Sequence, residues 1–201
     1  MSRIVCVVEG KGEVEAIPTL IARLLVRLSV TDLFVDQQPV RQPRGHLVDE
    51  RVRSPRRPAR AEGLDKALRL ALKRRDVTGV VVMCDSDDDC PAVWGPSATA
   101  LMNPLTVGFA VMAVREFETW LLHGKTDEEL RAARVADPDR RRNAKAALAR
   151  IHPGYLPTTH QRDLTRALDL DRAWSRSDSF DKLVRGLAAI CRVTVPPRPP
   201  L

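Results

Sequence analysis

The sequence predicts an α/β fold with a central parallel sheet flanked by helices and a C-terminal helical extension. Three short apolar runs rich in β-branched residues, 3–8, 77–84 and 107–114, are each followed by a segment with helical periodicity. Beyond Gly124, helical segments follow one another without a clear strand. The 201 residues, 44% hydrophobic and 29% charged, can bury a sizeable core, which excludes disordered, collagen-like and disulfide-stapled classes.

The first 124 residues form the predicted α/β domain. Its expected elements are a strand over 3–8, a helix over 13–28, a weaker extended segment over 33–41, a helix over 61–75, a strand over 77–84, a helix over 92–102 and a strand over 107–114. Pro18 is tolerable in the first helix only near its first turn, because proline lacks the amide hydrogen. The stretch 42–60, which contains proline, glycine and arginine, is expected to be a long loop.

A helical subdomain over 125–195 and a Pro-rich tail over 196–201 complete the expected organisation. A short helix opens at residues 115–118, and further helices are expected over 127–133, 141–151, 161–168 and 179–190. Trp94, Trp120 and Trp174 fall at helical positions and are expected in the core. With aromatic residues at only 4%, recognition of nucleic acid by base stacking is not indicated.

Targeting and cysteine signals are absent from the sequence. No apolar run approaches the roughly 18–20 residues that a membrane span needs, and the N-terminal strand leads into an acidic glycine-containing loop rather than a cleavage site. The four cysteines form no Cys-x-x-Cys pair and have no histidine at zinc-ligand spacing. We therefore expect a cytoplasmic, unprocessed protein with structural thiols and no membrane association.

The charge is basic, with 33 Lys and Arg against 26 Asp and Glu, for a net charge of +7. The excess is concentrated in the segments 41–60 and 140–150. Such clusters favour a polyanionic partner, although a solvated surface explains them equally well. The candidate nucleic-acid contacts are Lys11, Arg44, Arg53, Arg56, Arg57, Arg115, Arg141 and Lys145.

Acidic residues follow all three predicted strands. The carboxyl ends of parallel strands meet at one edge of a sheet, where ligands of α/β proteins bind. Two carboxylates about 4 Å apart repel by roughly 4 kcal/mol at an effective dielectric near 20, so gathering several requires a cation. An oxygen-only ligand set favours Mg²⁺ or Mn²⁺ over Zn²⁺. The candidate metal ligands are Glu9, Glu13, Asp85, Asp87, Glu116 and Glu118.

The acidic motifs at 87–89 and 116–118 also have a purely structural explanation. Asp87, Asp88 and Asp89 could cap the helix that follows them, and Glu116 and Glu118 could be first-turn acids of theirs. Glu9 precedes a glycine at the end of a buried strand and is harder to explain as a cap. The stretch Gly10-Lys11-Gly12 lacks the spacing of a phosphate-binding loop for ATP.

These motifs together resemble the TOPRIM domain, a Rossmann-like domain of topoisomerases, bacterial primases, maturases and OLD-type nucleases. They are Glu9-Gly10 with Glu13, and then Asp85-Ser86-Asp87. The third motif, over 115–122, resembles a stand-alone bacterial TOPRIM-like family, a domain of unknown function often encoded beside OLD- and ABC-type ATPases. Tyr155 and the segment 177–180 are also similar to that family. The resemblance implies that Glu9 is a metal ligand or general acid/base. It further implies that Asp85 and Asp87 are metal ligands, and that Glu13 and Glu118 are candidates for a second ion.

The resemblance implies a Mg²⁺- or Mn²⁺-dependent nuclease acting on DNA or RNA, with an ABC- or OLD-type ATPase as a possible partner in phage defence or a mobile element. Its catalytic residues would be Glu9, Asp85 and Asp87. One alternative is a non-catalytic TOPRIM-like module that binds a partner or nucleic acid. Another is a nucleotide-sugar transferase with a metal-binding Asp-x-Asp at Asp85 and Asp87, which leaves Glu9 unexplained.

Overall fold

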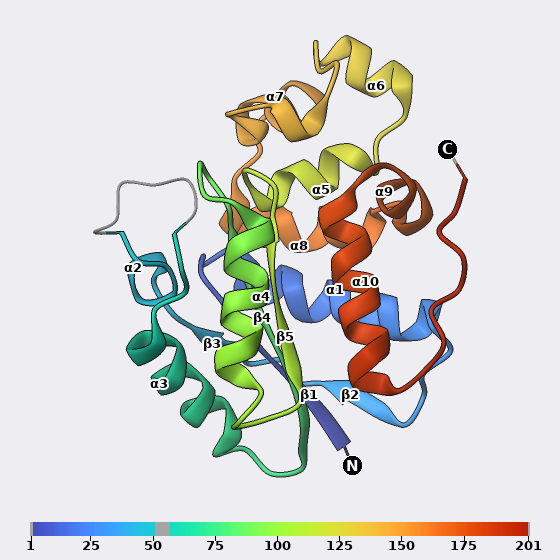
Figure 1. Ribbon diagram of the computed structural model, residues 1–201. Helices are drawn as coiled ribbons and strands as arrows, with labels where there is room; N and C mark the ends of the chain where they lie inside the picture. The colour runs from blue at the N-terminus through green and yellow to red at the C-terminus, as the bar shows by residue number, and fades with distance from the viewer. Residues whose placement is uncertain (1, 51–56, 201) are drawn as a thin grey trace.

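A parallel sheet lies at the centre of the computed structural model, which describes residues 2–50 and 57–200 (Figure 1). The strands are β1 (Ser2–Val8), β2 (Leu33–Val35), β3 (Val40–Arg41), β4 (Val77–Asp85) and β5 (Gly108–Ala113). Their order is β2-β1-β4-β5, and β3 pairs with the carboxyl-terminal part of β1. Every strand pair is parallel. The predicted α/β fold is therefore confirmed.

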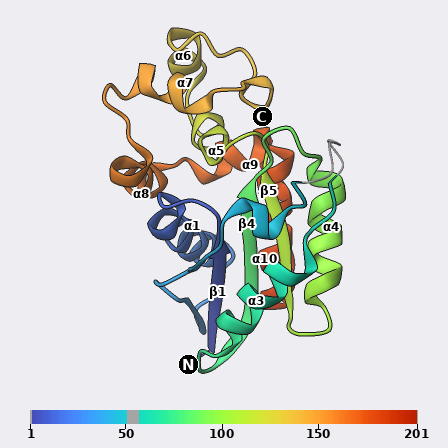
Figure 2. The ribbon, with the colours of Figure 1, turned by 90° about the vertical axis from the view of Figure 1, so that its left-hand side faces the viewer.

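Each face of the sheet is covered by helices (Figures 1 and 2). Alternate side chains of β1 point to opposite faces, as the pleat requires. Ile4, Cys6 and Val8 join a core that includes α1 (Glu13–Arg27) and α10 (Asp178–Cys191). Val5 and Val7 join a second core with α3 (Ala61–Leu72) and α4 (Pro91–Met102). Burial on both faces explains why these strands read as continuous apolar runs.

Pro18 corrects one expectation, because α1 continues through it well beyond the first turn. The proline removes one helical hydrogen bond and crowds the carbonyl four residues earlier. Its own ring is buried, together with Ile17, Leu20 and Ile21 on the same helix. Packing of this apolar face against the sheet therefore outweighs the local cost of the proline.

Helices dominate the chain after β5, and they share the core with the sheet. They are α5 (Phe117–His123), α6 (Asp127–Ala132), the 3₁₀ turn η1 (Pro138–Arg140), α7 (Ala144–Ile151), α8 (Pro157–Ala167), α9 (Leu170–Arg176) and α10. Here α8 packs on α1, and α10 packs on β5. Trp94, Trp120 and Trp174 are buried, as predicted.

Two short helices were not expected from the sequence. The first, α2 (Arg44–Leu47), lies within the predicted loop, and Val48 beyond it forms an isolated bridge with Ala59. The second, α9, is capped by Asp169, whose carboxylate accepts a hydrogen bond from the Arg172 amide. Both are too short for hydrophobic periodicity to be visible.

No helix among the described residues combines the length and apolar character that crossing a bilayer requires.

Candidate functional site

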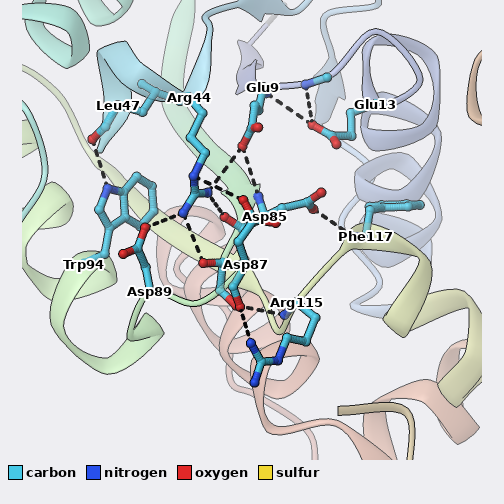
Figure 3. Close-up of polar contacts among 12 residues, drawn as sticks. Glu9, Glu13, Arg44, Leu47, Asp85, Asp87, Asp89, Trp94, Arg115 and Phe117 are labelled. Carbon is cyan, nitrogen blue, oxygen red and sulfur yellow. Dashed lines mark hydrogen bonds and ion pairs between the residues drawn. The ribbon is translucent and has the colours of Figure 1, made fainter. Parts of the chain in front are cut away.

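Acidic residues follow the carboxyl ends of β1, β4 and β5, which lie at one edge of the sheet. Figure 3 shows the acidic side chains that follow β1 and β4 gathered there. Glu9 follows β1, Asp85 is the last residue of β4, and Glu118 lies in the first turn of α5 after β5. Figures 1 and 2 show α5, α6 and α7 beyond this edge. The predicted convergence of carboxylates from the three strands is therefore what the fold produces.

Asp85 connects the three strand ends. Its Oδ1 accepts a hydrogen bond of 2.8 Å from the Phe117 amide at the start of α5. Its own amide donates to Oε2 of Glu9 over 3.3 Å. Asp85 is therefore hydrogen-bonded to both neighbouring acidic segments.

Glu13 closes the loop that carries Glu9. Oε2 of Glu13 accepts hydrogen bonds from the amides of Glu9, at 3.2 Å, and Gly10, at 2.9 Å. A Cβ atom on Gly10 would lie only 2.9 Å from Oε1 of Glu13, so the close approach of this carboxylate depends on glycine. Glu13 is buried, and its hydrogen bonds to the two amides hold the loop that carries Glu9 in place.

Glu118 is held by residues of the helical region. Oε1 accepts a hydrogen bond of 2.9 Å from the Tyr155 hydroxyl and a longer one of 3.4 Å from Nε2 of Gln161. Oε2 is buried and has no hydrogen-bond partner among the described residues. Sequence reasoning did not place Tyr155 or Gln161 in the site, because nothing in the local sequence indicates that they reach it.

Arg44 places a positive charge beside the acids that follow β1 and β4 (Figure 3). Its guanidinium lies 3.3 Å from Oδ2 of Asp87 and 3.6 Å from Oε2 of Glu9, and it pairs with Asp89. It also donates to the main-chain carbonyl oxygens of Asp85 and Ser86. Arg44 was predicted to contact nucleic acid, but in this structure it contacts protein acids and carbonyls.

The acids after β4 do not cap α4. The N-cap residue of that helix is Cys90, which has no side-chain capping bond, so the capping explanation of Asp87, Asp88 and Asp89 is wrong. Asp87 and Arg115 both have positive φ angles, of 46° and 64°. The Asp87 amide donates to the Arg115 carbonyl over 3.0 Å, which joins the loops after β4 and β5.

Burial is the largest influence on the protonation of these acids. It raises the pKa of Glu9, Asp85 and Glu118, and the increase for Asp85 is large. Burial, together with the charges of Glu9 and Glu118, raises the pKa of Glu13 to about 7, although hydrogen bonds from the Gly10 and Glu9 amides oppose the increase. The free carboxylates are therefore poorly stabilised as anions.

Lys145 provides a cation on the α7 side of the site. Burial lowers the pKa of its ammonium group, but the charges of Glu118, Glu116 and Asp85 outweigh this, so that the pKa is raised. The Lys145 amide also donates to Oε2 of Glu116 over 3.1 Å. Glu116 is accordingly engaged with α7, at the periphery of the cluster.

The donor set fits a hard divalent cation. The acids of the cluster offer only oxygen, burial disfavours their anionic forms, and Oε2 of Glu118 has no partner in the part of the chain that the structure describes. Within residues 2–50 and 57–200, no group of three His, Cys, Asp or Glu side chains is already arranged around a single metal position. A Mg²⁺ ion that keeps several water ligands needs only one or two of these carboxylates.

The remaining predicted basic contacts surround the site. Lys11 is exposed in the loop after β1. Arg115 forms an ion pair with Asp88. The exposed Arg142 lies 3.5 Å from the same aspartate. Arg141 is half-buried, and Nε of Arg57 lies 3.1 Å from Oδ1 of Asp89. The predicted contacts Arg53 and Arg56 lie outside the described residues.

Comparisons with known proteins place most of the chain in one family model. No curated protein and no solved structure matches the chain. A family model described as a domain of unknown function, DUF4276, matches residues 8–188, from the end of β1 into α10. The matched region contains every acidic residue of the site. The chain therefore belongs to the DUF4276 family.

Proposed function

We propose that the protein is a Mg²⁺- or Mn²⁺-dependent nuclease of TOPRIM type that hydrolyses phosphodiester bonds in DNA or RNA. The observation that carries the proposal is the convergence of Glu9, Asp85 and Glu118 from three parallel strands, with the pKa of each raised by burial. Such a cluster is unfavourable unless a cation shares it. The resemblance of the motifs to TOPRIM nucleases supports the same activity.

Glu9, Asp85 and Asp87 would hold the ion, with Glu13 and Glu118 available on the α1 and α5 side. A bound divalent ion supplies neutralisation of phosphate charge and an activated water. As the alternative to holding the ion, Glu9 would accept a proton from the nucleophilic water. Lys145 and Arg115 lie at the rim, where cations would orient the phosphate backbone.

A cleavage assay tests the proposal. The full chain is incubated with plasmid, linear single-stranded DNA and total RNA, in Mg²⁺, Mn²⁺ or EDTA. We expect cleavage that EDTA abolishes and that Asp85→Asn and Glu9→Gln reduce by at least about a hundredfold. Asp65→Asn, at a surface ion pair with Arg69 on α3, is the matched control and should retain activity. Full cleavage by Glu9→Gln or Asp85→Asn protein contradicts the proposal.

A non-catalytic module is the second candidate, and one observation favours it. The guanidinium of Arg44 lies beside the carboxylates of Glu9, Asp87 and Asp89, so a cation of the chain itself balances these acids. Such a module would act by binding nucleic acid or an ABC- or OLD-type ATPase. It predicts a melting temperature that does not change in millimolar Mg²⁺ or Mn²⁺, because a ligand that binds only the native state would raise it.

A further inference from the structure

The guanidinium of Arg44 lies among oxygen atoms from two adjacent strand ends (Figure 3). It contacts Oδ2 of Asp87 at 3.3 Å and approaches Oε2 of Glu9 at 3.6 Å. On its other side it contacts Asp89 and the carbonyl oxygens of Asp85 and Ser86. The side chain is only 14% exposed, so these contacts enclose the charge.

Glu9 and Asp87 are two of the three acids that the proposed function assigns to a divalent ion. A guanidinium and a metal ion require the same oxygen atoms, and the two cations repel each other at short range. We propose that Arg44 is a built-in counter-ion that competes with the divalent cation for Glu9 and Asp87. This inference rests on the proposed function, and it concerns how that site is regulated.

The backbone that carries Arg44 is anchored, so the competing movement belongs to the side chain. Leu47 of the same short helix is fully buried, and its carbonyl accepts a hydrogen bond of 3.0 Å from Nε1 of Trp94. A Cβ atom on Gly63 would lie 1.9 Å from the His46 carbonyl oxygen, so α2 rests directly on α3. Rotation about the Arg44 side-chain bonds can release Glu9 and Asp87 without moving α2.

A second explanation of the same contacts gives the opposite result. If Arg44 serves only to fasten α2 to the loop after β4, its removal would loosen Asp87 and Glu9 and weaken ion binding. If Arg44 competes, its removal leaves those carboxylates without their cation and strengthens ion binding. Whether the affinity for the divalent ion rises or falls on removal of Arg44 therefore distinguishes competition from a purely structural role.

Titration of the full chain with Mn²⁺ alone tests the inference, by calorimetry and by the electron paramagnetic resonance signal of unbound Mn²⁺. We expect the dissociation constant to fall about tenfold in Arg44→Ala, which removes the competing charge, and to change less in Arg44→Lys, which keeps it. The control is Arg74→Ala, which removes a partly buried arginine, 26% exposed and paired with Asp36 at 2.6 Å, away from the site. It should bind Mn²⁺ like the wild type.

The outcomes are distinguishable from failure of the proposed function. Equal or weaker Mn²⁺ binding in Arg44→Ala, with clear binding by the wild type, overturns the role of Arg44 and leaves the nuclease proposal standing. Absence of Mn²⁺ binding in every protein overturns both. Should Arg44→Ala not fold, Arg44→Gln replaces it, and a rise of its melting temperature in Mn²⁺ no larger than that of the wild type overturns the inference.

Discussion

The hydroxyl group of Tyr155 donates a hydrogen bond of 2.9 Å to Oε1 of Glu118, and both side chains are buried. Tyr155 lies between α7 and α8, whereas Glu118 belongs to α5 at the end of the sheet. The helical region therefore supplies a group that orients one of the carboxylates of the candidate site. The contact links the two parts of the chain that the sequence predicts as separate units.

Tyr155→Phe removes this hydrogen bond while keeping the ring. Oε1 of Glu118 then keeps only the longer contact with Gln161. We expect the free energy of unfolding to fall by about 1–2 kcal/mol, measured by urea denaturation, because a buried acceptor loses its main donor.

A double-mutant cycle with Glu118→Leu, which removes the acceptor, provides the control for Tyr155→Phe. If the hydrogen bond carries the effect, Tyr155→Phe costs less stability in the Glu118→Leu background than in the wild type. An equal cost in both backgrounds would assign the effect to ring packing instead.

The candidate acids could be predicted from the sequence because each follows an apolar strand, and parallel strands carry their carboxyl ends to one edge. Arg44 and Tyr155 could not be placed in the same way. Arg44 reaches the site through α2, a four-residue helix in a segment whose sequence predicts a loop. Tyr155 reaches the site because the helices after β5 pack together, and the sequence does not show how those helices are placed against the sheet. Long-range contacts of this kind leave no periodic signal in one sequence.

The stability of the metal-free protein should fall as the pH rises. The pKa of Glu13 is raised from 4.5 to about 7 by burial and by the charges of Glu9 and Glu118. The folded state therefore binds a proton more tightly than the unfolded state, so that stability is lost between these two pH values. Urea denaturation in EDTA at a series of pH values measures the change in the free energy of unfolding.

Glu13→Gln isolates the contribution of this group. The amide oxygen of Gln can still accept hydrogen bonds from the Glu9 and Gly10 amides, but it does not titrate. The decline in stability with pH should therefore become shallower. Glu15→Gln, at an exposed position in the same helical turn, is the control, and a slope equally shallow there would contradict the assignment.

Arg115 should tolerate glycine better than alanine. Its φ angle is 64°, in the left-handed region that costs a residue with a Cβ atom about 1–2 kcal/mol. Both variants lose the ion pair with Asp88 equally, so their difference reports the backbone alone. We expect Arg115→Gly to unfold at a higher urea concentration than Arg115→Ala. The reverse order would show that the loop does not hold this conformation in solution.

Ser86→Ala should loosen the same loop from the β4 side. Oγ of the buried Ser86 accepts a hydrogen bond of 2.8 Å from the Arg115 amide. Its loss leaves that amide unpaired, and we expect a cost of about 1–2 kcal/mol in the free energy of unfolding. Ser97→Ala is a suitable control, because its hydroxyl accepts only a longer bond of 3.3 Å from the Ala59 amide. A larger loss of stability in Ser97→Ala would argue against a special role for Ser86.

Nucleic-acid binding, if it follows the proposed function, should depend strongly on salt and on the α7 side of the site. Arg142 is exposed, and Lys145 faces Glu118 and Asp85 at the rim, so both can approach a phosphate near the carboxylates. Each phosphate contact contributes about 0.7–0.9 to the slope of log affinity against log salt, because a condensed counterion is released.

Fluorescence anisotropy with labelled DNA and RNA in EDTA, over roughly 50–300 mM salt, should show a slope smaller in magnitude by about one in Arg142→Ala than in the wild type. Arg166→Ala, at a surface pair with Asp163 on α8, should keep the wild-type slope. An unchanged slope in both variants would place the nucleic acid on another surface, because phosphate contacts that lie at this rim cannot be lost without releasing fewer counterions.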